Sequence, residues 1–308
     1  MLSQLCHVLY GITLGVNMLW AAGIMKVICL VPGLAKAQQQ GLCLMLVKAA
    51  WTLSFLFCPW VWCQPGKDLQ LQWSNTVEVM KKSDAEQKAS GSDPRPLFVL
   101  GNHTSFLDTI IAASIGLPMG VLWRCRTYMD AGLFKMPLLG TICRCVGHFP
   151  VHFTSGEDGV FKVDAEKMQK VEEQVDGHLR TGGWLCFFPE GQVNKTPDKI
   201  LPFRYGGMKN ALKFDARLVT FVCVGNTSVW PKGAKLGGYP GKVVYGTKPI
   251  ALDGSRALVA KARADNLPEE KDMQDHELLA RRAHALMQAH YDELKGQLVA
   301  MSGDKKED

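Results

Sequence analysis

The chain of 308 residues is 47% hydrophobic and 21% charged, and it carries a formal net charge of +6. This length accommodates one catalytic domain of ordinary size with an appendage. The modest positive charge suits anionic substrates or an anionic lipid surface, and it is too small to indicate a nucleic-acid-binding protein. The ten cysteines match no zinc spacing and several lie in apolar runs, so we expect reduced thiols in a cytosol-facing protein and no metal site.

Two apolar stretches begin the chain. Residues Leu5 to Met25 carry no charge and are numerous enough to span a bilayer as a helix, whereas a signal peptide would need a basic start and a small-residue cleavage site. The second stretch, Gly41 to Cys63, contains Lys48. A lysine at mid-bilayer costs about 3 kcal/mol, so we expect Lys48 to reach an interface by snorkelling. Three tryptophans of this stretch suit an interfacial belt: Trp51, Trp60 and Trp62.

Residues 1–63 are therefore predicted to form a membrane-associated helical segment, with a buried soluble hairpin as the alternative. Residues 64–96 are mixed in charge and end in the turn-rich KASGSDPRP, which predicts a linker. Strand and helix patterns alternate in residues 97–253, which indicates an α/β core. Residues 254–308 are predicted to form a C-terminal helix and a polar tail, whose final KKED is similar to a dilysine retrieval signal of endoplasmic reticulum membrane proteins.

The stretch LFVLGNHTSFLDTIIAASIG, from Leu97 to Gly116, predicts a strand, a tight polar turn and a helix. Asp108 falls in the first helical turn, where its carboxylate can bind free N–H groups and reach one nitrogen of the His103 ring. The other ring nitrogen would then act as a base. Ser105 lies in the same turn without a Gly-x-Ser-x-Gly elbow, so we expect a capping or turn role for it. A His/Asp pair without a serine nucleophile suits direct acyl transfer to a substrate hydroxyl.

A second motif, WLCFFPEGQVN from Trp184 to Asn194, again places a polar turn after an apolar strand. The pair NHTSFLD and FFPEG, in this order, resembles the NHxxxxD and FPEG motifs of the glycerolipid acyltransferase family, which includes the 1-acylglycerol-3-phosphate acyltransferases. Three further blocks are similar to family segments: FKMPLLG, LPFRYGGMKNAL and YGTKPI. The resemblance covers roughly residues 97–252. It implies a mixed sheet flanked by helices, as in glycerol-3-phosphate acyltransferases, with a membrane-associated pair of N-terminal helices.

The resemblance also implies roles for single residues. His103 would be the general base, oriented by Asp108, in a transfer from acyl-CoA to the hydroxyl of a lysophospholipid, 1-acylglycerol-3-phosphate in the first place. Acyl-CoA would be a co-substrate, and no cofactor is expected. Asn102 would shape the turn in the substrate site. Glu190 would lie in the acceptor-binding region, and Gly191 would let the backbone approach the ligand.

The chain departs from the family where the family carries two arginines. FPEG is followed by Gln192, Val193 and Asn194 instead of the usual TRS, and Phe153 lies near the position of the second arginine. Either the charge for an acceptor phosphate comes from other basic residues, or the phosphate is held in a different way. Lys195 and Arg204 are the first candidates, and four more residues could contribute: Lys209, Arg124, Arg126 and Arg144.

Two alternatives stay open. FPEGQVN resembles the FPEGKVN of the tafazzin branch of the superfamily, whose members transfer acyl chains between phospholipids without coenzyme A. A non-catalytic lipid-binding scaffold is the other alternative, against which the intact His103, Asp108 and Glu190 argue. In each case we expect partners in the membrane and none among nucleic acids. The predicted location is a membrane, that of the endoplasmic reticulum, with the core facing the cytosol.

Overall fold

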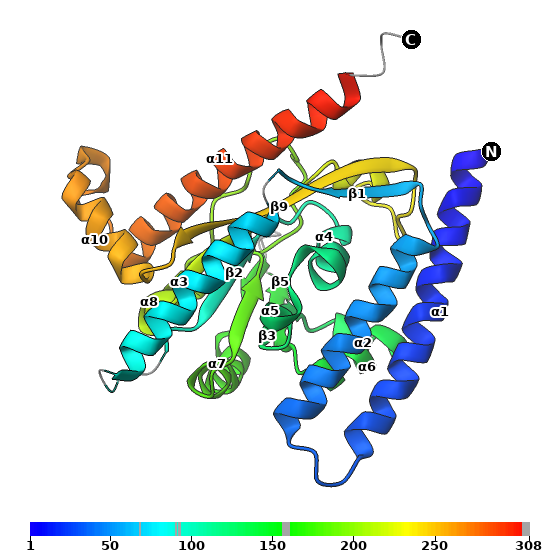
Figure 1. The fold of residues 1–308 in the computed structure, drawn as a ribbon, viewed down its shortest axis with the longest axis horizontal. Coiled ribbons are helices and arrows are strands. Elements are labelled where there is room, and N and C mark those ends of the chain that lie inside the picture. The colour runs from blue at the N-terminus through cyan, green and yellow to red at the C-terminus, as the bar shows by residue number, and fades with distance from the viewer. Residues whose placement is uncertain (68, 90, 92–93, 156–160, 304–308) are drawn as a thin grey trace. The chain divides into compact units, whose positions relative to one another are not determined.

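The computed structural model describes residues 1–303 except 68, 90, 92–93 and 156–160. The chain divides into two compact units, each assembled from separate stretches. One unit comprises Met1–Gly11, Cys58–Ala112 and Phe187–Asp308, and the other comprises Ile12–Phe57 and Ala113–Cys186. Figure 1 shows the elements coloured along the chain.

The first unit contains a mixed sheet. Its strands follow the order β1 (Val61–Pro65), β9 (Gly241–Ala251), β8 (Arg217–Val224) and β2 (Leu97–Gly101). β8 and β9 are antiparallel, whereas β1 is parallel to β9 and β2 is parallel to β8. Every residue of β2 and of β8 is buried, which explains why both read as nearly unbroken apolar runs.

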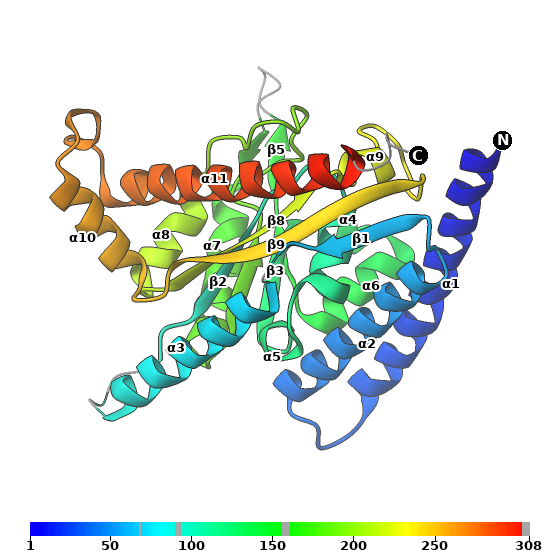
Figure 2. The same cartoon turned by 45° about the horizontal axis from the view of Figure 1, so that its top comes forward.

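Helices cover this sheet. The long C-terminal helix α11 (Asp275–Gly303) packs on β8 and β9, and α3 (Leu69–Ala89) contacts β9; Figure 2 shows α11 running along β9. The shorter helices of the unit are α4 (Leu107–Ile111), α8 (Tyr205–Lys213), α9 (Asn226–Val229), α10 (Ser255–Asp265) and the 3₁₀ turn η3 (Pro268–Glu270).

The second unit contains three parallel strands in the order β7 (Trp184–Phe187), β3 (Cys125–Asp130) and β4 (Phe149–Val151). A separate antiparallel pair is formed by β5 (Phe153–Ser155) and β6 (Phe161–Val163). Helix α2 (Lys36–Leu56) packs on α6 (Pro137–Val146). The remaining elements are α5 (Met119–Leu122), α7 (Ala165–Arg180), the π-helical η1 (Ala112–Gly116) and the 3₁₀ turn η2 (Leu133–Lys135).

The predicted fold class, a mixed α/β sheet flanked by helices, is confirmed, and so is the strand, turn and helix at Leu97 to Gly116. Two predicted boundaries are wrong. Residues 64–96 are more than a linker, because they contain the 21-residue helix α3. The helical segment predicted for residues 1–63 ends in β1, which pairs with β9 in the sheet.

Helix α1 (Leu2–Leu30) matches the first apolar stretch. Among the described residues it is the one helix long and apolar enough to span a membrane by length and composition, with a mean hydropathy of 1.6. The second stretch differs from prediction. The Lys48 ammonium donates to the backbone oxygens of Ser114 and Leu117, so it satisfies carbonyls near the end of η1 instead of snorkelling.

The predicted tryptophan belt is contradicted at Trp51 and stays a prediction at the other two positions. Trp51 is buried among its neighbours in α2's unit, whereas the Trp60 indole N–H donates to the Gly238 carbonyl at 2.8 Å. Trp62 lies on strand β1. Tertiary packing therefore uses two of the three indoles. The predicted retrieval signal KKED falls on residues 305–308, outside the described part of the chain.

Candidate active site

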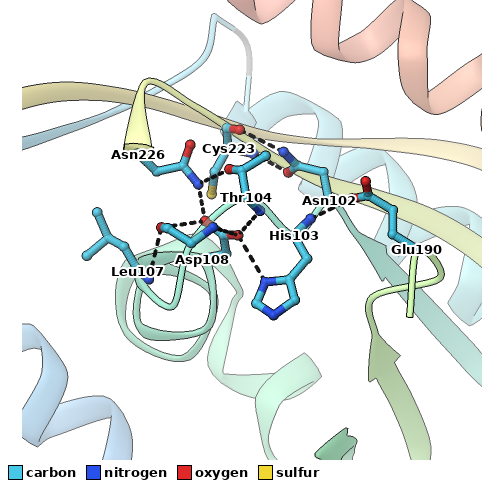
Figure 3. Close-up of polar contacts among 9 residues, drawn as sticks. Asn102, His103, Thr104, Leu107, Asp108, Glu190, Cys223 and Asn226 are labelled. Atoms are coloured by element: carbon cyan, nitrogen blue, oxygen red, sulfur yellow. Dashed lines mark hydrogen bonds and ion pairs between the residues drawn. The ribbon is translucent and has the colours of Figure 1, made fainter. Parts of the chain in front are cut away.

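The candidate site is built at the end of β2, within the first unit (Figure 3). Asn102 follows the last residue of the strand and is buried. Its side-chain amide donates to the Cys223 carbonyl at 2.9 Å and accepts from the Cys223 N–H at 2.8 Å. Both polar groups of the amide are thus used to fasten the turn to the end of β8. Asn102 therefore helps to shape the turn, and its assignment to the substrate site stays a prediction.

His103 and Asp108 meet across the turn, as their spacing predicts. The Nδ1 atom of His103 lies 3.2 Å from Oδ2 of Asp108. The same oxygen accepts the N–H groups of Thr104 at 2.7 Å and Ser105 at 3.0 Å. Because an ionised carboxylate can only accept, the shared proton belongs to Nδ1, and Nε2 is left as a proton acceptor.

The burial of the pair differs between its members. Asp108 is completely buried, whereas 15% of the His103 side chain is exposed. A carboxylate held by backbone donors, with an imidazole that keeps one accessible edge, can take a proton from a bound hydroxyl and stabilise the resulting imidazolium. Ser105 serves the turn itself, since its hydroxyl accepts from the Leu107 N–H at 3.1 Å and lies 3.3 Å from Asp108 Oδ1. Its expected turn role is confirmed.

Glu190 of the FPEG motif accepts hydrogen bonds from the backbone at and near the turn that carries His103. One carboxylate oxygen accepts the His103 N–H at 2.7 Å, and the other accepts the Leu201 N–H at 2.9 Å. The side chain is only 1% exposed. Burial raises the pKa of Glu190, and the two backbone donors oppose that rise. These contacts show that Glu190 supports the backbone at His103, and its predicted place in the acceptor-binding region stays a prediction.

Aromatic side chains border the His103 ring. Phe188, which precedes the Pro-Glu-Gly of the second motif, stacks on the imidazole with ring centroids 4.2 Å apart and an interplanar angle of 13°. Phe106 meets the ring edge-on at 6.3 Å and is 48% exposed. One face of the base is therefore fixed by packing, which limits the rotamers open to His103.

Gly191 has a positive φ of 69°, and a Cβ there would lie 2.8 Å from Cγ of Arg204. Both the backbone conformation and the lack of room for a Cβ therefore require a glycine at this position. Arg204 is fixed at its backbone by an N–H bond to Pro189 O at 2.7 Å. The side chains of Lys195 and Arg204 are exposed and form no ion pair with any residue that the structure describes. Their charge is available to a ligand, and their predicted role stays a prediction.

The sequence alone predicts no role for two asparagines of the site. Asn194 donates its N–H to the His103 carbonyl at 2.6 Å, and its side chain binds Lys199 O and the Thr196 N–H. Asn226 donates to the Thr104 hydroxyl at 2.6 Å and to Asp108 Oδ1. Their place in the sequence is the signal that could have found them, because each follows an apolar strand, as the residues of the two motifs do.

Comparisons with known proteins support the family resemblance and the fold. Residues 76–224 match the family model described as Acyltransferase. The fold is similar to the crystal structure of the 1-acyl-sn-glycerophosphate (LPA) acyltransferase PlsC from Thermotoga maritima, with a TM-score of 0.57 and 15% identity over 88% of this chain and 97% of that chain. A sequence comparison with curated proteins finds no match.

Proposed function

We propose that the chain, whose residues 76–224 match the Acyltransferase family model and whose motifs resemble those of glycerolipid acyltransferases, esterifies a lysophospholipid. The donor is acyl-CoA, and the acceptor is 1-acylglycerol-3-phosphate, which becomes phosphatidic acid. The single observation that carries this proposal is the His103–Asp108 contact at 3.2 Å, in a turn whose one serine, Ser105, accepts from the Leu107 N–H. Such a pair activates a hydroxyl that the substrate brings.

The proposed reaction is a direct transfer. Nε2 of His103 takes the proton of the acceptor hydroxyl as its oxygen attacks the thioester carbonyl, while buried Asp108 stabilises the imidazolium. The new C–O bond forms a tetrahedral intermediate. The C–S bond then breaks, and the proton passes from Nε2 to the departing coenzyme A sulfur. The ester product and free coenzyme A leave, so the enzyme returns to its starting state.

Recognition of the acceptor is proposed to rest on exposed cations beside the second motif. Arg204 packs its aliphatic stem over Gly191 and keeps its guanidinium at the surface. A guanidinium binds phosphate oxygens through charge-assisted hydrogen bonds, and Lys195 can add a second positive charge. Membrane association through α1 would present the protein to a lipid acceptor and to the acyl chain of its donor.

The test uses purified protein in mild detergent with labelled oleoyl-CoA. The acceptors are lysophosphatidic acid, lysophosphatidylcholine, monolysocardiolipin and glycerol 3-phosphate. We expect transfer to lysophosphatidic acid, and His103→Ala should lower kcat by about 10²- to 10⁴-fold because the base is lost. His276→Ala, on α11, is the matched control and should keep native activity.

Other outcomes distinguish the alternatives. Transfer from labelled phosphatidylcholine, with none from oleoyl-CoA, would replace the proposed donor by a phospholipid and make the protein a transacylase. Absence of transfer from both donors to all four acceptors would contradict catalysis and favour a lipid-binding scaffold. Activity that survives in His103→Ala would contradict the assignment of the base.

A further inference from the structure

The two oxygens of the Asp108 carboxylate have different partners (Figure 3). Oδ2 accepts from Thr104 N, Ser105 N and the His103 ring. Oδ1 lies near the Ser105 hydroxyl at 3.3 Å and accepts from the side-chain amide of Asn226. The donor of Asn226 thus stands on the side of the carboxylate opposite to His103.

Asn226 reaches this position from 118 residues further along the chain. Its side chain is buried, and the amide nitrogen donates both to Asp108 and to Thr104 Oγ1. Both amide protons therefore serve the turn between His103 and Asp108. Asn226 is almost completely shielded from solvent, with 2% of its surface exposed.

The backbone before Asn226 is built for this placement. Gly225 has a φ of 87°, and a Cβ there would lie 2.4 Å from the Lys242 carbonyl oxygen. The chain therefore turns sharply after β8 and starts α9 at Asn226. Three residues earlier, Cys223 pairs with Asn102 through both of its backbone polar groups. The end of β8 and the turn after β2 are joined at two points.

We propose that Asn226 is a positioning residue for the acyl transfer, holding the Asp108 carboxylate in the rotation that directs Oδ2 at His103. This inference rests on the proposed function. The terminal torsion of an aspartate is broad, so one strong donor on Oδ1 selects among its rotations. Without that donor Oδ1 keeps only the Ser105 hydroxyl at 3.3 Å, so the carboxylate is held less firmly and the imidazole is less well oriented. Asn226 does not touch the reacting atoms.

Three variants test the proposal. In Asn226→Ala we expect kcat to fall about 10- to 100-fold, with KM for both substrates within about twofold of native, because misplacement by 1 Å can lower a rate by about 10²-fold. Asn226→Asp keeps the size of the side chain but places a second carboxylate beside Asp108. Thr227→Ala, at the next position of α9, is the matched control and should be indistinguishable from native protein.

The pH–rate profile separates positioning from a structural role. Two adjacent buried carboxylates share one proton, because like charges at this distance cannot both ionise readily. At low pH the proton of the pair can donate to Asp108 Oδ1 as Asn226 does. As the pH rises the proton is lost, so Asn226→Asp should show a falling alkaline limb that is absent from the native profile.

A readout that needs no acyl transfer completes the test. Diethyl pyrocarbonate modifies accessible neutral imidazoles, and peptide mass spectrometry gives the rate at His103, with His276 as internal reference. We expect the pH dependence of that rate to change in Asn226→Ala and Asn226→Asp, each checked for a cooperative thermal transition. Native kcat and a native modification profile in both variants would overturn the proposal, as would a change in KM alone. An inactive native protein would instead refute the proposed function, while the modification rates would still decide the role of Asn226.

Discussion

Among single residues, Glu190 shows how a buried carboxylate can serve the backbone. Each of its oxygens accepts one main-chain N–H, from His103 and from Leu201. Glu190→Gln keeps the shape but replaces one acceptor oxygen by an NH₂ group, which leaves one buried N–H without a partner. We expect the free energy of unfolding to fall by about 1–3 kcal/mol and kcat to fall about tenfold, as measured by melting and steady-state kinetics.

The control for Glu190 is Glu293→Gln. Glu293 is 47% exposed and pairs with Lys248 at the surface, so its loss should change stability by less than about 0.5 kcal/mol. A Glu190→Gln protein that melts like the native one, but has a raised KM for the acceptor alone, would contradict the supporting role. It would restore the direct acceptor contact that the family resemblance implies.

Arg204 gives a prediction about specificity. If its exposed guanidinium holds the acceptor phosphate, Arg204→Gln should raise KM for lysophosphatidic acid about tenfold or more and leave kcat nearly unchanged, since a hydrogen bond to a charged group contributes about 1.5–3 kcal/mol. Kinetics with the acceptor varied at saturating oleoyl-CoA measure this. Lys261→Gln, which removes an exposed cation from α10, serves as the control. An unchanged KM would mean that another cation holds the acceptor phosphate.

At the scale of elements, a buried histidine of α11 forms a hydrogen bond with the sheet. His290 is 3% exposed, and its Nδ1 lies 2.9 Å from the hydroxyl of Thr220 on β8. That hydroxyl also donates to Lys248 O on β9 at 3.1 Å. Burial lowers the pKa of His290 from its usual 6.5 to about 4. The folded protein therefore holds this ring neutral at a pH where the unfolded chain protonates it.

The sign of the resulting pH dependence follows from proton uptake. Between pH 6.5 and pH 4 the unfolded state binds more protons at His290 than the folded state does, so stability falls as the pH falls through that window. From pH 7.5 to pH 5 this contribution amounts to about 2 kcal/mol. Chemical denaturation at both values should show a smaller loss in His290→Phe than in native protein.

The stability of His290→Phe at the higher pH serves as its internal control. Loss of the Thr220 contact lowers the stability of His290→Phe equally at every pH, so only the slope reports the titration. A variant with the same slope as native protein would contradict a depressed histidine pKa as the cause.

Elements also show where sequence reasoning stops. The apolar run of β2 and the helical pattern of the C-terminal region are local patterns, and the sequence predicts both. Helix α3 was predicted as linker because it has 21 residues of mixed charge and only three buried ones, Trp73, Thr76 and Met80. Its helicity depends on packing against β9, which no local pattern reveals. Lys48 was misjudged for the same reason, since its carbonyl partners lie 66 and 69 residues away.

On the scale of the whole molecule, the candidate site is assembled within one unit from three distant stretches, around residues 102–108, 188–204 and 223–226. The first two carry motifs and were predicted from spacing and strand ends. The third has no motif, and its asparagine reaches Asp108 only through the pairing of β8 with β2. The contact between His103 and Asp108 could therefore be predicted from the sequence, whereas its contact with Asn226 could not.

The proposed function requires the whole molecule to meet a lipid, and α1 carries an apolar stripe that suits this. Five side chains at spacings of three or four residues are each more than half exposed: Leu5, Val8, Ile12, Val16 and Leu19. They lie on one helical face, which would be costly to leave in water. We expect native protein to float with vesicles of phosphatidylcholine and phosphatidic acid in a density gradient.

Val16 lies near the middle of α1, so a charge there measures how deeply the helix is inserted. If α1 spans the bilayer, Val16→Lys should weaken vesicle partitioning by about 2.5–3.5 kcal/mol, which is roughly 100-fold. If α1 lies in the interface, the lysine can snorkel to the headgroups and the loss should be several-fold at most. Ala37→Lys adds the same charge at an exposed position of α2 and corrects for attraction to anionic lipid. Native protein that stays with the soluble fraction in this gradient would contradict membrane association through α1, and the stripe would then need another covering partner.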